Sequence, residues 1–334
     1  MVTRCILAVD VMSGDLGPRI AVPAAVEFSN ANPDAQLILV GDSIQIESLL
    51  PSSYSRQITI EATQSVVTMA DKPSVALRKR KDSSMYRAVK LVAEGSADAC
   101  VCAGNTGALM AMGHYLLHMH PGIDRPAIAT AIPTQAGHSY MLDLGANVDC
   151  SAEHLLQFAL MGSALSEALD GLEAPRVALL NVGVEASKGN EQVKLASELL
   201  QAHAALNYIG YVEGNDIYSG IADVVVCDGF VGNVVLKSSE GLARFVTQQM
   251  RQSFTSNWYR RFVAFLARPM LSQLKQQLNP SRLNGASLLG LKGIVIKSHG
   301  SATQEGFVHA LLQAQTAVRR NVPGLISAKL GQIL

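Results

Sequence analysis

Short apolar runs recur along the chain, and most of them end in Gly, Asp or Asn. They cover residues 4–18, 36–42, 99–107, 127–133, 140–147, 177–185, 224–232 and 293–302. Between several of them, apolar residues follow helical spacing, as in 21–32, 85–95, 152–171 and 190–203. This alternation predicts an α/β fold with a mostly parallel sheet. Ligands of such sheets bind at the carboxyl ends of the strands, where polar residues recur in this chain.

Composition narrows the class of protein. The 334 residues are 49% hydrophobic but only 5% aromatic, which suits parallel strands covered by helices. A formal net charge of zero argues against nucleic acid as a partner. The five cysteines form no C-x-x-C pair, so we expect free thiols in a reducing cytosol. The sequence shows neither a secretory signal nor an apolar run long enough to span a membrane.

One short internal repeat stands out. Segments 97–110 and 222–235 agree at six of fourteen positions without a gap, and each reads as a strand, a Cys and a G-x-x-G turn into a helix. Such a turn directs free backbone amides at the space above the sheet and can bind an anion. Tight packing of strand on helix, with no ligand, is the alternative. A duplicated half-fold would place the two turns across one cleft.

Further basic residues follow predicted strands. Lys188 precedes the helix predicted over 190–203, and Lys297 and His299 follow a buried strand directly. Between residues 71 and 89, a run of cations precedes another helix and could hold an anion, although a solvated basic turn explains it equally well. Three histidines at 114, 118 and 120 lack an accompanying acid, so we expect no metal site.

Charge is distributed unevenly. No Asp or Glu occurs between residues 241 and 304, whereas nine Lys and Arg residues do. Within 251–278, aromatic and apolar residues follow helical spacing, cations occupy the other faces, and Pro269 must interrupt the run. This pattern predicts a basic amphipathic helical arm over 244–284 that binds a membrane, an acyl chain or a partner. An arm that forms a dimer or covers the core remains the alternative.

At these motifs the chain resembles the phosphate acyltransferase family, the acyl-carrier-protein:phosphate acyltransferases of bacterial phospholipid synthesis. The resemblance runs nearly end to end and rests on DKPSVALRKRKDSSM, AGNTGALM, LDLGANVDC, KGNEQVKLASELL, YVEGNDIYSGIADVVVCDGFVGNVVLKSSEG and GIVIKSHGSA. Val11, Ser13 and Val184 depart from the family pattern, and Val184 replaces a frequent acid.

The resemblance implies transfer of a fatty acyl group from acyl-ACP to inorganic phosphate, with no cofactor. The acyl phosphate would then feed a membrane glycerol-3-phosphate acyltransferase. It also implies a homodimer with a three-layer α/β/α fold like that of isocitrate and isopropylmalate dehydrogenases. Residues 1–334 would then form one domain of two intertwined, pseudo-symmetric halves. We expect it in the cytoplasm, peripherally bound to the anionic inner face of the cell membrane.

Site residues are assigned on this basis. Phosphate can attack a thioester itself, so the protein must hold the anion and stabilise an oxyanion. The predicted catalytic residues are Lys297, His299 and Asn233. The predicted phosphate-binding residues are Gly104, Asn105, Thr106, Gly107, Lys188, Gly229 and Gly232. The predicted contacts to acyl-ACP or membrane are Trp258, Arg260, Arg261, Phe262, Phe265 and Arg268.

Three other functions stay open at this point. A CoA-dependent phosphotransacetylase would share the fold and the chemistry, but a small acyl group needs no cationic apolar arm. A metal-dependent decarboxylating dehydrogenase would share the fold alone. A non-catalytic membrane scaffold for lipid enzymes would need only the arm.

Overall fold

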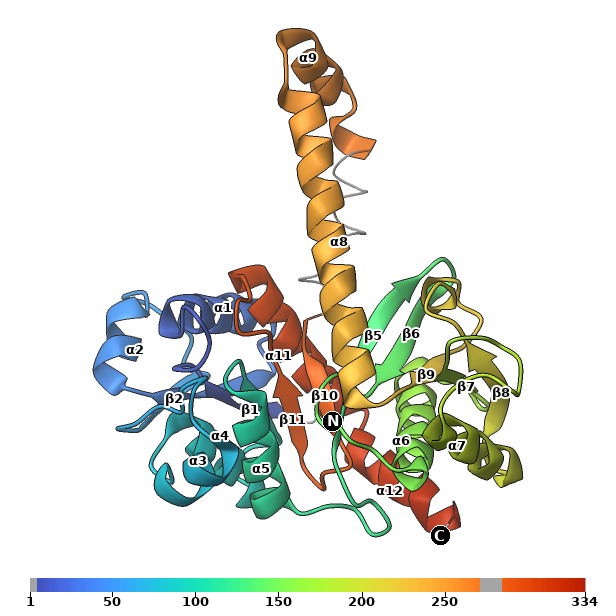
Figure 1. Cartoon of the computed structure of the whole chain (residues 1–334). Helices are drawn as coiled ribbons and strands as arrows, with labels where there is room; N and C mark the ends of the chain where they lie inside the picture. The colour runs from blue at the N-terminus through green and yellow to red at the C-terminus, as the bar shows by residue number, and fades with distance from the viewer. Residues whose placement is uncertain (1–4, 271–283, 334) are drawn as a thin grey trace.

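The computed structural model describes residues 5–270 and 284–333, and its centre is one mixed sheet. The strand order in this sheet is β3-β2-β1-β4-β11-β10-β5-β6-β9-β7-β8 (Figure 1). The strands are β1 (Cys5–Asp10), β2 (Ala35–Gly41), β3 (Ile58–Ala62), β4 (Ala99–Cys102), β5 (Ala127–Thr134), β6 (Gly137–Leu142), β7 (Arg176–Leu180), β8 (Asn207–Val212), β9 (Val224–Val226), β10 (Ala286–Leu289) and β11 (Ile294–Lys297).

Helices cover both faces of the sheet. They are α1 (Pro18–Ala31), α2 (Ser43–Leu49), α3 (Pro73–Lys79), α4 (Ser84–Ala93), α5 (Thr106–Leu117), α6 (Ala152–Asp170), α7 (Glu191–Ala202), α8 (Gly229–Thr255), α9 (Trp258–Leu266), α11 (Gln304–Arg319) and α12 (Val322–Ile333), with a short 3₁₀ turn at Asp216–Tyr218. The three-layer α/β/α fold predicted from the sequence is confirmed.

Alternation along β1 explains the layers on the amino-terminal side of the sheet. Leu7 and Val9 lie in the buried cluster that includes α1 and α11, whereas Ala8 lies in the cluster that includes α4 and α5. Because successive strand residues point to opposite faces, a strand covered on both sides must be apolar throughout. That requirement produces the continuous apolar runs visible in the sequence.

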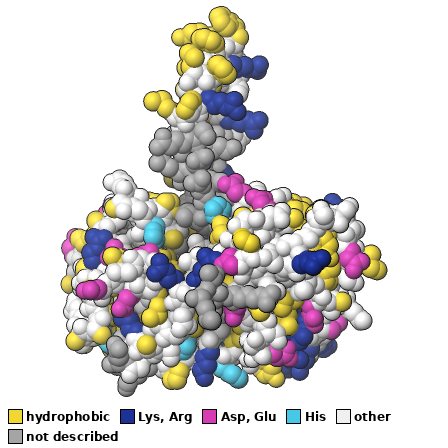
Figure 2. All heavy atoms as spheres, turned by 180° about the vertical axis from the view of Figure 1, so that it is seen from behind, with side chains coloured by type: hydrophobic (Ala, Val, Ile, Leu, Met, Phe, Trp, Pro, Cys, Tyr) yellow, Lys and Arg dark blue, Asp and Glu magenta, His cyan; other side chains and the backbone are white. Residues whose placement is uncertain are grey.

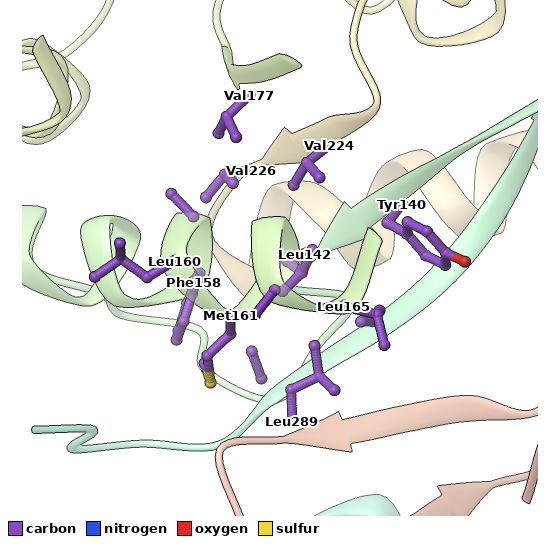
Figure 3. Packing of buried hydrophobic residues seen from close by; sticks show 14 of the residues in the cluster. Tyr140, Leu142, Phe158, Leu160, Met161, Leu165, Val177, Val224, Val226 and Leu289 are labelled. Carbon is purple, nitrogen blue, oxygen red and sulfur yellow. The ribbon is translucent and has the colours of Figure 1, made fainter. Parts of the chain in front are cut away.

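The other half of the sheet packs mainly on α6. Phe158, Met161 and Leu165 of this helix lie beside Leu142 of β6 and Leu289 of β10 (Figure 3). Helix α6 begins with a capping box, in which Ser151 and His154 each bond the other's backbone amide. This apolar packing fixes the strands from which the second glycine turn leaves.

Strand direction divides the sheet in two. Strands β3, β2, β1, β4 and β11 run parallel to one another, and so do β6, β9, β7 and β8. Three antiparallel pairings, β11 with β10, β10 with β5 and β5 with β6, join the two groups. An odd number of reversals makes the two groups antiparallel. Their carboxyl ends therefore point in opposite directions.

Helix α8 leaves the body of the molecule and carries α9 at its outer end (Figure 1). Its 27 residues span about 40 Å at 1.5 Å per residue. Within α8 only Gly229 and Gly232 are buried. The predicted amphipathic arm is thus helical and projecting over its described part.

All eight apolar runs read from the sequence contain a strand. The sequence reading did not identify β3, β8 and β10. Strand β3 lies at the sheet edge with four of its five residues exposed or half-buried, β8 contains Gly210, and β10 is four residues long. Such strands carry little of the apolar signal that marks a buried one.

Candidate active site at the carboxyl ends of three central strands

Three adjacent strands end at the same level. Asp10 of β1 is paired in register with Cys102 of β4, and Cys102 is paired with Lys297 of β11. We call the sheet edge formed by these carboxyl ends the rim. The register places a carboxylate, a thiol and an ammonium group side by side at the rim.

A buried carboxylate organises the loop after β1. Asp10 is fully buried, accepts a hydrogen bond from the Ser13 hydroxyl, and also accepts bonds from the Met12 amide at 3.2 Å and the Cys102 thiol at 3.1 Å. Further along the loop, the Asp15 amide donates to the Gly300 carbonyl at 2.8 Å. The loop after β1 is thereby joined to the loop after β11.

Lys297 and His299 lie where β11 ends. The Lys297 ammonium group donates to the Ser298 carbonyl, and the His299 amide donates to Asn284 Oδ1 at 2.8 Å. Burial lowers the pKa of Lys297, nearby Lys237 lowers it further, and Cys102, Asp10 and Asp15 oppose the shift. A bound anion would stabilise the charged form of a desolvated ammonium group of this kind.

Lys237 of α8 completes the cluster and was missed in the sequence analysis. Its Nζ lies 2.7 Å from His299 Nε2 and 3.2 Å from Glu240 Oε2, while Glu240 lies 3.8 Å from His299 Nε2. Burial, then Lys237, lowers the pKa of His299, and Glu240 opposes this. Lys237 stands one helical turn after Asn233, which is the only sequence signal that could have found it. Lys237, Lys297 and His299 are called the lysine–histidine cluster below.

The imidazole of His299 is also held from its other side. The Ser301 amide and hydroxyl lie 3.1 and 2.9 Å from Nδ1. An N–H donor at Nδ1 leaves that nitrogen as an acceptor, so a neutral ring carries its proton on Nε2, toward Lys237. Two proton-bearing nitrogens then face each other at 2.7 Å. An anion between them would relieve that contact.

The first glycine turn lies at the rim and begins α5. A Cβ on Gly104 would come within 2.5 Å of Met85 and 2.7 Å of the Ser13 hydroxyl, and one on Gly107 within 2.8 Å of Pro73. The two glycines therefore permit close packing as well as close approach of a ligand. Thr106, the first residue of α5, is half-buried beside them.

Asn105 in this turn has a structural task. Its Oδ1 accepts from the Ala108 amide at 3.1 Å, and its Nδ2 lies 3.0–3.3 Å from the carbonyl oxygens of Thr68, Met69 and Asp71. Both ends of the amide are thus occupied. Asn105 fixes the loop before α3 against the N-terminus of α5, so its side chain holds the turn in place.

The second glycine turn does not face the first. Strand β9 runs antiparallel to β4 and lies five strand spacings from it, about 24 Å. The Gly229 amide donates to Asn147 O at 2.8 Å, and the Gly232 amide donates to Asp228 O at 2.9 Å. Because both amides are engaged inside the protein, the expectation of two turns across one cleft is wrong.

Packing explains the glycines of the second turn. A Cβ on Gly232 would lie 1.8 Å from the Asp143 carbonyl oxygen, and one on Gly229 would lie 2.6 Å from Asn147 O. Asp143 is fully buried, and its carboxylate accepts bonds from the Ile128, Ala146 and Asn147 amides and the Asn147 side chain. This turn therefore has the tight strand–helix packing that the sequence left open as the alternative.

Asn233 and Lys188 lie in different settings. Asn233 is exposed on α8 beside Gly145, one turn before Lys237. Lys188 is exposed on the loop between β7 and α7, and β7 lies six strand spacings, about 29 Å, from β4. The fold thus brings Asn233 toward the lysine–histidine cluster, but it does not bring Lys188 to the rim.

The arm exposes its aromatic residues. Helix α9 buries none of its residues, and Trp258 and Phe265 are 81% and 68% exposed. Figure 2 shows hydrophobic side chains gathered at the end of the arm, with Lys and Arg side chains along one side. Phe262, Arg260, Arg261 and Arg268 are also exposed. The predicted arm positions Leu274, Lys275, Leu278 and Arg282 fall outside the described residues.

All five cysteines are free thiols. Burial raises the pKa of every one of them: to about 11 for Cys150, to about 12 for Cys5, and further for the others. A thiol that stays protonated is a poor nucleophile. The cysteine next to the rim, Cys102, acts instead as a hydrogen-bond donor to Asp10.

Neither a metal-binding cluster nor a membrane-spanning helix occurs among the described residues. They contain no group of three or more His, Cys, Asp or Glu side chains arranged to hold a metal ion. None of the helices formed by residues 5–270 and 284–333 is both long and apolar enough to cross a bilayer.

Comparison with known proteins gives consistent results. A family model described as "Fatty acid synthesis protein" matches residues 5–325. Curated proteins named "Phosphate acyltransferase" are similar over nearly the whole chain. The protein of Pseudomonas paraeruginosa is 54% identical over 332 residues, covering 98% of both chains, and that of Pseudomonas syringae pv. tomato is 55% identical over 329 residues, covering 97% and 96%.

Solved structures with a similar fold have much lower identity. A phosphotransacetylase from Streptococcus pyogenes aligns with a TM-score of 0.64 at 18% identity, covering 96% of this chain and 95% of the other. A 4-hydroxythreonine-4-phosphate dehydrogenase from Klebsiella pneumoniae aligns with a TM-score of 0.52 at 15% identity, covering 94% and 97%. At these identities the likeness concerns the fold alone.

Proposed function

The chain belongs to the phosphate acyltransferase family, whose family model is described as "Fatty acid synthesis protein", and from this membership we propose its reaction mechanism and its partners. It is an acyltransferase that moves an acyl group to phosphate in phospholipid synthesis. We propose that the donor is acyl-ACP and that the product is an acyl phosphate. A membrane glycerol-3-phosphate acyltransferase would then use this product.

The observation that carries the proposed site is the lysine–histidine cluster at the rim. Two ammonium groups and an imidazole lie close together at the end of β11, the strand next to β4, whose glycine turn begins α5. Inorganic phosphate carries one to two negative charges near neutral pH, and cations together with a helix N-terminus bind such an anion. We place phosphate between Lys237, Lys297 and His299, with Gly104, Thr106 and Gly107 on its α5 side.

The reaction then needs no covalent enzyme intermediate. A phosphate oxygen attacks the thioester carbonyl carbon, a C–O bond forms, the C–S bond breaks, and the thiolate leaves and takes up a proton. The raised pKa values of the cysteines agree with direct attack by phosphate. In the neutral form of His299, Nε2 carries the proton and can donate a hydrogen bond to a phosphate oxygen as the bond forms. Asn233 lies on the same face of α8 as Lys237 and is assigned to the carbonyl oxygen.

This assignment is tested by removing single charges. We expect Lys297→Met, Lys237→Met and His299→Gln each to lower phosphate-dependent release of ACP thiol by roughly 10²-fold, the usual loss when one stabilising donor is removed. Lys292→Met is the matched control, because Lys292 is exposed beyond the opposite end of β11. Near wild-type rates in the three site variants would remove the cluster from the site.

Choice of donor tests the rest of the assignment. Release of thiol from acyl-ACP at far lower concentrations than from acyl-CoA is the expected result. Equal use of both donors would favour a CoA-dependent phosphotransacetylase, for which the only support is the similarity in fold.

The arm supports two further proposals. The described part of α8 exposes Val231, Val234, Leu242, Phe245 and Val246, and an apolar stripe of this kind on a projecting helix fits pairing with a second copy. The aromatic end of α9 with its arginines fits an anionic membrane surface. We therefore propose a cytoplasmic homodimer that rests on the inner face of the cell membrane.

A further inference from the structure

A second basic surface lies apart from the arm. Lys72, Arg78, Lys79, Arg80 and Lys81 fall within ten residues that contain no Asp or Glu, in a chain whose formal net charge is zero. They occupy α3 and its two flanks. We call these five residues the α3 cations. The chemistry proposed above uses none of them.

The α3 cations are mostly exposed and form no ion pair with the described residues. Arg80 is half-buried and the other four are exposed. The ion pairs among the described residues involve none of the five, whereas nearby Arg87 is paired with both Glu61 and Glu94. The adjacent carboxylate, Asp71, accepts its hydrogen bonds from Thr68, and these bonds, followed by the charge of Arg80, lower its pKa. The fold therefore leaves their charge available to another molecule.

Contacts with α5 place this surface beside the rim. Asn105 holds the carbonyl groups of the loop before α3, and the Pro73 ring lies 2.8 Å from where a Gly107 Cβ would be. From Lys72 to Arg80 the chain rises about 12 Å along the α3 direction. Helix α3 packs against α5, and its first residue lies beside Gly107, so the cations lie along α3 within about 12 Å of the N-terminus of α5, the element assigned to phosphate.

We propose that the α3 cations dock the acidic carrier protein that presents the acyl thioester. This inference rests on the proposed function. A carrier that delivers its acyl group on a flexible arm must bind next to the reacting atoms without covering them, and α3 has that position. Charge complementarity of this kind speeds encounter and orients the partner.

A membrane fits α3 less well. Met69 and Val75 are the large apolar side chains that the described structure exposes here, whereas the arm exposes a Trp, a Tyr and two Phe on α9 alone. Insertion into an interface is stronger the more apolar and aromatic area a surface can bury. The arm arginines are accordingly assigned to the membrane and the α3 cations to the carrier.

Steady-state kinetics of the full chain with two donors test the proposal. The variant Arg78→Gln/Lys79→Gln/Lys81→Gln is compared with wild type on acyl-ACP and on an acyl thioester of N-acetylcysteamine, which has no protein part. We expect the KM for acyl-ACP to rise at least about tenfold and to lose most of its dependence on salt. The rate with the small thioester should stay within about twofold. The matched control, Arg56→Gln/Lys292→Gln/Arg320→Gln, removes three exposed cations elsewhere and should leave the KM for acyl-ACP unchanged. The arm variant Arg260→Gln/Arg261→Gln/Arg268→Gln tests the arm as the alternative docking surface.

Several outcomes would overturn the inference. Equal losses with both donors would assign the α3 cations a structural or catalytic task. A larger rise in KM from the arm variant would place the carrier on the arm. Lost binding to phosphatidylglycerol vesicles, with the KM for acyl-ACP unchanged, would make α3 a membrane surface. Failure of the wild-type chain to release thiol from either donor would instead refute the proposed function itself.

Discussion

At the residue scale, the protonation state of His299 depends on its burial and on its charged neighbours. Its pKa is lowered by burial and by Lys237, so the ring stays neutral at pH values where a free histidine is protonated. Lys237, which causes part of this, is a residue that sequence reading alone did not select. A lysine on an exposed helix has no distinctive pattern until the fold brings it to a strand end 62 positions away.

We predict a pH dependence of stability from this residue. As pH falls below about 6.5, the unfolded chain binds a proton at position 299 before the folded chain does, so stability is lost between that value and the lower folded pKa. His299→Gln should therefore lose less stability than wild type between pH 7 and pH 5, measured by urea unfolding.

His120 provides the internal comparison for that experiment. It is buried, and burial lowers its pKa in the same direction. His120→Gln should separately reduce the stability that is lost between pH 7 and pH 5, and the double variant should show the sum of the two reductions. If His299→Gln lost as much stability between pH 7 and pH 5 as wild type, the lowered pKa of His299 would be contradicted.

Two glycines on one helix give a second residue-scale prediction. Gly232→Ala places a Cβ against the Asp143 carbonyl oxygen and should lower the free energy of unfolding by about 3 kcal/mol or more. Gly241→Ala meets no atom within 4 Å and should raise it by about 0.5–1 kcal/mol. Urea denaturation at one fixed protein concentration measures both. Similar effects of the two substitutions would contradict the packing role of the second glycine turn.

At the element scale, the strands could be predicted where burial dictates their composition. Strands β1, β4, β9 and β11 are apolar on both faces, and each was visible as a run ending in a polar residue. Their directions could not be read in the same way. The β5–β6 hairpin and β10 reverse the sheet, and nothing in a run of apolar residues records whether its neighbour is parallel. The repeated glycine turn was real in sequence, but those reversals send its two copies to opposite sides.

The arm carries the element-scale prediction. Leu242→Asp/Phe245→Asp should convert a dimer to a monomer in light scattering, because charges would enter the apolar stripe of α8. Phe262→Ser/Phe265→Ser should instead weaken sedimentation with phosphatidylglycerol vesicles by at least about tenfold, since each buried aromatic contributes about 1.5–3 kcal/mol. Each variant should leave the other property near wild type. A loss of both properties in both variants would mean that the arm does not divide its tasks between α8 and α9.

At the scale of the whole molecule, a net charge of zero hides separated surfaces. Cations gather on α3 and on the arm. Carboxylates lie at the site itself, where Asp10 accepts a hydrogen bond from Ser13 and Glu240 pairs with Lys237. The resemblance in sequence led to the reaction and the fold class. The location of the site required the register that makes Asp10, Cys102 and Lys297 neighbours. Lys188 lies in a suitable sequence motif, but β7, the strand before it, is about 29 Å across the sheet from β4.

A crystal structure of the protein with phosphate would show whether the lysine–histidine cluster captures inorganic phosphate. We expect phosphate oxygens within hydrogen-bonding distance of Lys237 Nζ, Lys297 Nζ and a His299 ring nitrogen, beside the first turn of α5, and no phosphate there in Lys297→Met crystals. Phosphate bound elsewhere in wild-type crystals, with Lys237 still in contact with His299, would contradict this proposal.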